Sequence, residues 1–216
     1  AILEALRAMS VWEWFGTVFG IAGVVLTAKR SVLCWPAWLV SIIAYGVFFT
    51  QIKLYADATL QIFFLITSIL GWLAWRKDQA TDTAAELPVT WTPTRERWAY
   101  LGLTLIASIG IGFVFDRYTD AHVPYWDAGC AGISVAAQIL MMKRRIESWH
   151  LWVVVDVVYT ALYATKSAWL TVILYAIFAV IAVGGLREWR KSVSNKRSQL
   201  KRLPFGKLRA QAFYGQ

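Results

Sequence analysis

The sequence predicts an all-α integral membrane protein with seven transmembrane helices, arranged as two parallel three-helix repeats joined by one linker helix. Two observations carry this prediction: an apolar composition and an internal repeat. Of the 216 residues, 58% are hydrophobic and 16% are charged, whereas soluble domains carry about 25% charged residues. Hydrophobic stretches long enough to cross a bilayer recur from end to end, so we expect one membrane domain and not a soluble domain with an anchor.

Seven apolar stretches are predicted to be the spans. At 1.5 Å per residue, stretches of about 18–20 residues are roughly 27–30 Å long, which matches the hydrocarbon thickness of a bilayer. They are apolar on all sides, and helices satisfy their own backbone hydrogen bonds in lipid. The spans are residues 11–28, 35–50, 54–75, 98–115, 125–142, 148–165 and 167–186.

An internal repeat relates the two halves of the chain. Shifting the sequence by 114 residues aligns it with itself, without a gap, over residues 12–77. The identical pairs include Trp12 with Trp126, Trp35 with Trp149, Trp38 with Trp152, Tyr45 with Tyr159, Gly71 with Gly185, and Trp75 with Trp189. Because a single linker helix separates the units, both enter the membrane in the same direction, which gives a parallel repeat about an axis near the membrane normal.

Charge predicts the topology. The loops after the first, third and fifth spans, together with the C-terminal tail, hold 18 of the 22 Lys and Arg residues, so the N-terminus is predicted outside and the C-terminus in the cytoplasm. This asymmetry accounts for the net charge of +9 without nucleic acid as a partner. The tail is interpreted as an anchor to anionic lipid head groups of the bilayer.

The predicted organisation has six parts. They are an amphipathic lead-in at 1–10, the first repeat at 11–77, a solvated cytoplasmic loop at 78–97, the linker helix at 98–115, the second repeat at 125–191 and a basic cytoplasmic tail at 192–216.

One carboxylate, Asp156, lies near the middle of the sixth span. A charge at bilayer depth costs about 2.5–3.5 kcal/mol, so such a residue is a candidate for function. Helical steps of about 100° place Trp149, Trp152, Asp156, Tyr159 and Tyr163 on one narrow face. A face of this kind suits a pocket for a flat, polar, cationic molecule. The alternative is a structural acid that is protonated or paired.

The repeats differ at their polar positions. Asp156 pairs with Ile42 and Gln138 with Val24, which is the asymmetry that a single off-axis site would produce. Gln138 lies at the depth of Trp152 and is predicted either to face it across a pocket or to hydrogen-bond the fifth span to the sixth, a contact worth about 0.6 kcal/mol.

The first repeat supplies further candidates. Trp35, Trp38 and Tyr45 repeat the aromatic stripe without an acid and are expected to pack or gate. Gln61 is a candidate hydrogen-bond partner for a substrate, as are Thr67 and Ser68. The sequence contains no metal-ligand spacing, no Ser-His or Cys-His pair in a recognisable context and no phosphate-binding glycine loop, so neither an enzyme nor a cofactor is expected.

Several motifs together resemble the Pnu family of bacterial vitamin transporters. They are Trp35-Pro36, Lys53-Leu54-Tyr55-Ala56-Asp57 followed by Leu60-Gln61, Gly71-Trp72 with Trp75, and above all Trp149-x-x-Trp152-x-x-x-Asp156. The resemblance covers nearly the whole chain, from the first span to Trp189. It implies a three-plus-one-plus-three fold related to the SWEET sugar transporters. It also implies facilitated diffusion across the bacterial inner membrane without a coupling ion, after which a cytoplasmic kinase would trap the imported vitamin.

The resemblance also implies a substrate site at Trp149, Trp152 and Asp156. Many riboside transporters of the family have Asn where this chain has Asp156. Nicotinamide riboside and thiamine both contain a flat cationic ring that an acid suits, and neutral riboflavin gains less from it. We therefore expect a nicotinamide riboside carrier, with a thiamine carrier as the alternative. A non-transporting receptor or scaffold, a proton-coupled carrier and a homo-oligomer are left open.

Overall fold

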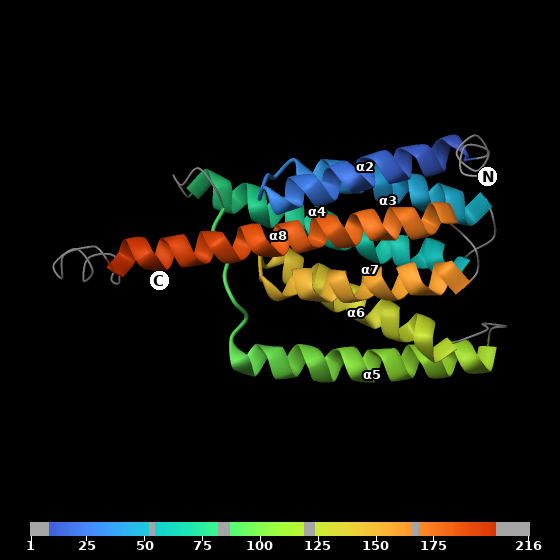
Figure 1. Cartoon of the computed structure of the whole chain (residues 1–216). Coiled ribbons are helices and arrows are strands. Elements are labelled where there is room, and N and C mark those ends of the chain that lie inside the picture. The colour runs from blue at the N-terminus through green and yellow to red at the C-terminus, as the bar shows by residue number, and fades with distance from the viewer. Residues whose placement is uncertain (1–8, 52–54, 82–86, 119–123, 166–168, 202–216) are drawn as a thin grey trace.

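The computed structural model describes residues 9–51, 55–81, 87–118, 124–165 and 169–201, and this part of the chain contains seven helices (Figure 1). They are α2 (Val11–Ala28), α3 (Cys34–Gln51), α4 (Tyr55–Thr81), α5 (Thr94–Tyr118), α6 (Pro124–Met142), α7 (Glu147–Thr165) and α8 (Trp169–Lys201). The shortest, α2 and α3, have 18 residues each, which is about 27 Å and long enough to cross a bilayer. The prediction of an all-α protein with seven long helices is confirmed.

The helix bounds lie close to the predicted spans where the sequence is apolar and extend further where it is polar. Helix α2 has the predicted bounds, and Ser10 and Glu13 form a capping box at its start. By contrast, α4 continues to Thr81 and α8 to Lys201, into segments expected to be loop and tail. Most of the predicted lead-in (1–8) and the end of the tail (202–216) lie outside the described residues.

Hydropathy differs among these helices. Within the described residues, three stretches combine length with an apolar composition sufficient to cross a membrane: Val11–Ala28, Cys34–Gln51 and Thr171–Lys196. Helix α7 has the length but includes Asp156 and other polar residues. Polar side chains inside a membrane bundle almost always face its interior, so α7 is expected to contribute to an internal site.

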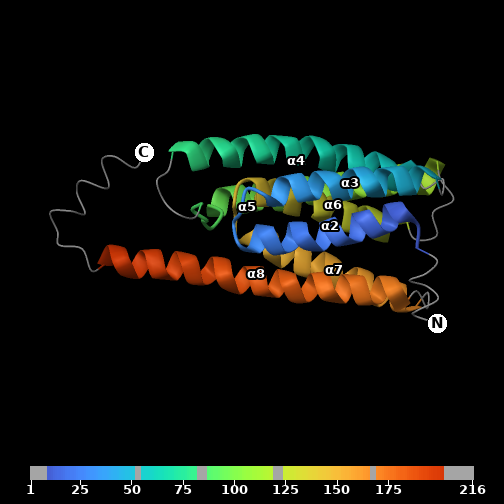
Figure 2. The ribbon, with the colours of Figure 1, turned by 90° about the horizontal axis from the view of Figure 1, so that it is seen from above.

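Six helices form a ring and α5 lies outside it. Each helix contacts the next in the order α2, α3, α4, α6, α7 and α8, and α8 contacts α2, which closes the ring. Helix α5 packs on α6 and is set apart from the other helices in Figure 1. In Figure 2, α4, α3, α2 and α8 follow one another from top to bottom, in the order of their contacts. This is the three-plus-one-plus-three arrangement, with α2–α4 and α6–α8 as the two units and α5 as the linker.

Two equivalent tryptophan clusters stabilise the repeats. In each cluster a tryptophan from the middle helix covers a glycine of the third helix and meets a second tryptophan edge-on. The ring centroids are 5.3 Å apart in the first cluster and 5.5 Å apart in the second. The clusters are Trp35/Gly71/Trp75 and Trp149/Gly185/Trp189. The glycines are required because a Cβ at either position would overlap the ring above it.

Reciprocal hydrogen bonds then join the two repeats. The indole nitrogen of Trp75 donates to the carbonyl of Met142, at the end of α6, over 2.9 Å. Its counterpart Trp189 donates to the carbonyl of Ala28, at the end of α2, over 3.1 Å. Both donors and both acceptors are related by the 114-residue shift, so the two halves hold each other by the same contact made in both directions.

The residues after α2 and α6 add a second reciprocal contact. Arg30 and Arg144 have positive φ angles of 56° and 52° and end their helices with the paired backbone hydrogen bonds of a Schellman motif. Glycine usually occupies this left-handed position. Here each guanidinium crosses to the other repeat, where Arg30 donates to Ser192 over 2.7 Å and Arg144 pairs with Asp78. We call this end of the ring, marked by Arg30 and Arg144, the basic end.

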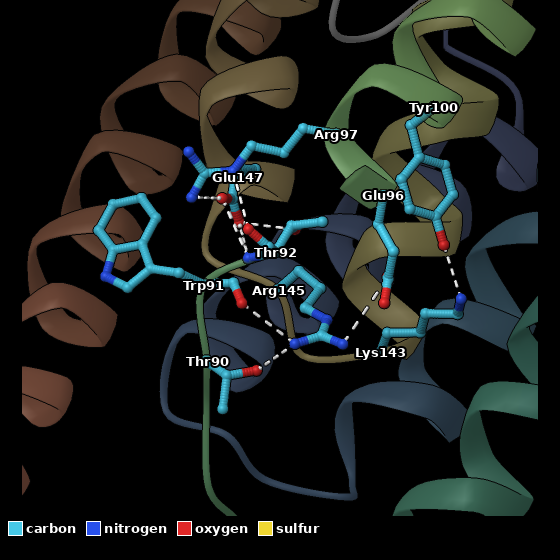
Figure 3. A network of polar contacts seen from close by, with 9 residues as sticks. All are labelled: Thr90, Trp91, Thr92, Glu96, Arg97, Tyr100, Lys143, Arg145 and Glu147. Carbon is cyan, nitrogen blue, oxygen red and sulfur yellow. Dashed lines mark hydrogen bonds and ion pairs between the residues drawn. The ribbon is translucent and has the colours of Figure 1, made fainter. Parts of the chain in front are cut away.

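The segment between α4 and α5 is not solvated throughout, so that prediction was wrong in part. Leu87 and Val89 are 4% and 6% exposed, and Thr90 forms an isolated parallel bridge with Arg145 in the α6–α7 turn. Figure 3 shows the polar network that follows, in which the Glu147 carboxylate accepts from the backbone and side chain of Thr92. Residues 87–92 thus pack across the basic end.

Candidate functional site

A cavity of about 240 Å³ lies inside the ring. All six ring helices contribute to its lining, which is mainly aromatic and aliphatic with a few polar groups. The lining residues are Val24, Thr27, Trp35, Trp38, Ile42, Phe49, Leu60, Gln61, Phe64, Ser68, Ser134, Gln138, Met141, Trp149, Trp152, Val155, Asp156, Tyr159, Tyr175, Phe178 and Ala182. Concave, mostly apolar sites with a few placed polar groups are typical of small-molecule binding.

Seven of the eight residues selected from the sequence line this cavity: Trp149, Trp152, Asp156, Tyr159, Gln138, Trp38 and Gln61. Tyr45 is not among the lining residues. Its hydroxyl shares a 2.9 Å hydrogen bond with Thr17, and its ring lies against Gly16. The structure therefore places Tyr45 between α2 and α3, where it packs the first repeat.

Asp156 is the one acidic residue in the lining. Asp156 is 6% exposed. The Thr160 hydroxyl donates over 2.7 Å to the backbone carbonyl of Asp156 and not to its carboxylate. No Lys, Arg or His from the described ranges lines the cavity. The carboxylate thus faces an aromatic chamber without a cationic side chain beside it.

Gln138 both lines the cavity and joins two helices. Its side-chain nitrogen donates to the hydroxyl of Ser68 over 3.3 Å, which links α6 to α4. The sequence had suggested a link from the fifth span to the sixth, and the partner helix differs because α4 lies next to α6 in the ring. An amide oxygen such as that of Gln138 accepts hydrogen bonds, so Gln138 can serve as donor and acceptor at once.

Trp38 is held in place by a chain of hydrogen bonds. Its indole nitrogen donates to the Thr27 hydroxyl over 3.1 Å, and that hydroxyl donates to the carbonyl of Gly23 over 2.7 Å. The ring lies over Gly23, where a Cβ would come within 2.9 Å of it. Trp38 therefore presents a ring of fixed position to the cavity, and its indole N–H is already bonded to Thr27.

Sequence reasoning missed several lining residues, of which Tyr175 has a ring 5.0 Å from that of Tyr159. The repeat contained the signal for it, because the 114-residue shift pairs Tyr175 with Gln61. Trp35, which was expected to pack or gate, lines the cavity too. Ser134 and Thr27 were missed as cavity residues. Small polar side chains of this kind are common in helix contacts, so position alone does not single them out.

A second hollow, of about 560 Å³, lies between α3 and α4. Its lining is almost wholly apolar and includes Ile43 and Ile62, which are 53% and 58% exposed. This groove faces outward, where a membrane protein meets lipid, and it holds no charged residue. The smaller central cavity is the better candidate because it combines enclosure with polar groups.

Comparison with known proteins gives a consistent result. A family model described as nicotinamide mononucleotide transporter matches residues 10–191. The nicotinamide riboside transporter PnuC of Escherichia coli (strain K12) is 26% identical, over 87% of this chain and 88% of that protein. The riboflavin/roseoflavin transporter RibM of Streptomyces davaonensis is 23% identical, over 83% of this chain and 84% of that protein.

A solved structure shares the fold. The crystal structure of the vitamin B3 transporter PnuC matches with a TM-score of 0.73 and 22% sequence identity, over 90% of this chain and 86% of that chain.

Proposed function

Because the chain belongs to the nicotinamide mononucleotide transporter family, whose members are membrane transporters and not enzymes, we propose that it imports nicotinamide riboside. Transport is by facilitated diffusion across the bacterial inner membrane, with the N-terminus outside and the C-terminus in the cytoplasm. Substrate binds in the central cavity, and a cytoplasmic kinase then traps it.

The observation that supports this substrate is a carboxylate in an aromatic chamber. The pyridinium ring of nicotinamide riboside is flat and cationic, so it gains from the face of Trp152 and from the charge of Asp156. A buried carboxylate is unfavourable without a partner, and a cationic ligand would supply one. Ribose hydroxyls and the carboxamide can hydrogen-bond to Asp156 and Gln138.

The same charge argues against the phosphorylated form. A mononucleotide carries a phosphate that would need Arg, Lys or backbone donors, and the described lining offers no basic side chain. Its negative charge would also be repelled by Asp156. The proposed substrate is therefore the riboside and not the mononucleotide, in spite of the family's name.

Cavity size favours a molecule with one aromatic ring and one sugar. The volume of about 240 Å³ lies below the usual range of about 300–1,000 Å³ for small-molecule sites. The three-ring flavin of the riboflavin carrier's substrate is larger and uncharged, so it fits this lining less well. Thiamine is cationic, and Asp156 favours it as the second candidate.

The ring of helices also supports a transport mechanism. Two parallel units that enclose one site can rock against each other and open it to either side in turn. The reciprocal contacts at the basic end would be broken and re-formed in such a movement.

Calorimetric titration of the purified protein in detergent tests the proposal. Nicotinamide riboside, its mononucleotide, thiamine and riboflavin are compared at neutral pH. We expect the riboside to bind and the mononucleotide to bind at least about tenfold more weakly, which corresponds to about 1.4 kcal/mol. Asp156→Leu should lower riboside affinity, whereas Asp116→Asn, at an exposed acid of α5, should not.

Each other outcome has a definite meaning. Binding of thiamine alone would replace the vitamin while retaining the site. Binding of the mononucleotide as tightly as the riboside would refute the charge argument. If none of the four ligands binds, a receptor or scaffold is favoured. Riboside uptake that a pH gradient drives in proteoliposomes would show proton coupling in place of facilitated diffusion.

A further inference from the structure

Residues 87–92, which we call the strap, lie between the two three-helix units in the chain and pack across the basic end of the ring. A substrate that leaves the central cavity toward this end has to pass the packed residues to which the strap contributes. The contacts that the strap makes with each unit therefore bear on how this end opens.

Backbone hydrogen bonds attach the strap to the second repeat. The amide of Thr90 donates to the carbonyl of Arg144 over 3.2 Å, and the amide of Ile146 donates to the carbonyl of Thr90 over 3.0 Å. The guanidinium of Arg145 also donates to the Thr90 hydroxyl over 2.7 Å. The strap is thus bonded to the α6–α7 turn through both its backbone and a side chain.

Glu147 extends this attachment to α5. Its carboxylate accepts from the backbone amide of Thr92 over 3.0 Å and from the Thr92 hydroxyl over 2.9 Å, and it pairs with Arg97 over 2.8 Å (Figure 3). The 114-residue shift pairs Glu147 with Leu33, which is 66% exposed and whose side chain accepts no hydrogen bond. The attachment therefore belongs to the second repeat and has no equivalent acceptor in the first.

The contact between the strap and the first repeat is apolar. Leu87 and Val89 are 4% and 6% exposed, and they belong to a buried cluster that includes Trp75 of α4. Within the described ranges, no hydrogen bond joins the strap to α2, α3 or α4. Apolar contact is non-directional, whereas hydrogen bonds require defined distances and angles. A movement between the units therefore separates the strap from the first repeat more readily than from the second.

We propose that the strap is a gate at the basic end, which stays bound to the second repeat and separates from the first repeat when the cavity opens there. Its Leu87 and Val89 lie in the same buried cluster as Trp149, which lines the cavity. The inference rests on the proposed function, which it deepens. The proposed topology places the basic end in the cytoplasm, so this gate controls release of the imported substrate.

Two cross-links distinguish the face of the strap that separates from the face that does not. Thr90→Cys with Arg145→Cys joins the strap to the second repeat by a disulfide, because bridged strands lie about 4.7–4.9 Å apart and a disulfide spans Cα distances of about 4.4–6.8 Å. Asp78→Cys with Pro88→Cys joins the strap to α4 through a short bis-maleimide, because both residues contact the side chain of Arg144.

Uptake of nicotinamide riboside into proteoliposomes and riboside binding in detergent are measured before and after each cross-link. The bis-maleimide bridge should abolish uptake and leave binding unchanged, because the other end of the cavity can still open. The disulfide should change neither uptake nor binding when oxidised and reduced samples of the same variant are compared. Pro88→Cys alone and Thr90→Cys alone, treated with the same reagents, are the controls, and the native Cys34 and Cys130 are buried.

A measurement without ligand tests the gate separately. The indole N–H of Trp75 donates to the carbonyl of Met142 in the other repeat, and opening of the basic end breaks this hydrogen bond. In protein labelled with ¹⁵N-tryptophan, the bis-maleimide bridge should therefore slow exchange of the Trp75 indole proton with solvent, and the disulfide should not. The resonance is assigned by its absence in Trp75→Phe.

The outcomes distinguish this proposal from the one on which it rests. Uptake that continues with the bis-maleimide bridge in place would overturn the gate, and uptake lost on disulfide formation would show that the strap leaves the second repeat, contrary to the proposal. Loss of binding with the bridge would overturn a role in release, because the strap would then control entry. Failure of the unchanged protein to bind riboside would refute the proposed substrate, and equal exchange at Trp75 with and without the bridge would then overturn the gate as well.

Discussion

Gly185→Ala is expected to destabilise the protein, whereas Gly184→Ala, at the preceding residue of α8, is expected to be tolerated. A Cβ at position 185 would lie 2.6 Å from Cζ2 of Trp149, well inside the optimal carbon–carbon separation of about 3.5–4.0 Å. A Cβ at position 184 would meet nothing within 4 Å. The two substitutions therefore add the same methyl group to the same helix in opposite surroundings.

The expected magnitude follows from the fixed position of the ring. Trp149 is 1% exposed and meets Trp189 edge-on with centroids 5.5 Å apart, so Trp189 restricts movement of the ring on that side. Overpacking of this kind costs about 1–3 kcal/mol. Because Gly→Ala gains the same helix propensity at both sites, the difference in unfolding free energy between the two variants isolates this cost.

Thermal unfolding in detergent, followed by tryptophan fluorescence, measures the difference. For a chain of this size 1 kcal/mol corresponds to about 2–4 °C in Tm, so Gly185→Ala should unfold at least that far below Gly184→Ala. Adding Trp149→Phe to both variants should shrink the gap, because a smaller ring relieves the overlap and the two sites are coupled. Equal Tm values for the two single variants would refute the packing argument.

Three further predictions concern the basic end. Trp75→Phe and Trp189→Phe should each lower the free energy of unfolding by about 1–3 kcal/mol, because each leaves a carbonyl of the other repeat without its donor. Equal losses in Tm would confirm that the two contacts are equivalent, and a loss from one variant alone would contradict it. Arg144→Ala should cost about 0.2–1 kcal/mol, because it removes the ion pair with the partly exposed carboxylate of Asp78 in the other repeat. Urea unfolding in detergent measures the loss, and an unchanged unfolding free energy would contradict it. Glu147→Gln should accelerate hydrogen exchange in residues 87–92, and unchanged exchange would show that burial alone holds that segment.

The helices and much of the cavity could be predicted because their signals are local. The length of the apolar stretch predicted the bounds of α2. The matching tryptophans made the 114-residue repeat visible. Helical steps of about 100° placed Trp149, Trp152, Asp156, Tyr159 and Tyr163 on one face. The first four line the cavity, and the side chain of Tyr163 is outside the part that the structure describes. On one helix, spacing alone was enough to identify neighbours.

Tyr45 shows where the repeat misleads. Its counterpart Tyr159 lines the cavity, but Tyr45 lies against Gly16 and bonds to Thr17. In the second repeat the equivalents of those two residues are Cys130 and Ala131, which offer neither the same space nor a hydroxyl. Identical side chains thus take different roles because their neighbours on another helix differ.

The segment 87–92 could not be predicted from composition. The longer linker, which is polar and contains two prolines, was expected to be a solvated loop, yet residues 87–92 pack on the basic end through Thr92 and Glu147, which are 55 residues apart in the chain. No periodicity links residues so distant, and Thr92 has no special property until Glu147 is placed beside it. Only the ring of helices determines that contact.

The two repeats are alike in the contacts that join them and differ in the cavity, and this difference bears on how a substrate would be oriented. The residues that hold the repeats together come in equivalent pairs, such as Trp75 with Trp189 and Arg30 with Arg144, so the two units can move against each other through balanced contacts. The acid of the cavity has no such counterpart, since Asp156 lines the site where the first repeat has Ile42. A symmetric lining would bind the substrate equally well in two orientations related by the pseudo-twofold axis. If the proposed function holds, a single carboxylate lowers the free energy of one of them, and we therefore expect Asp156, which has no acidic counterpart in the first repeat, to fix the orientation of the substrate.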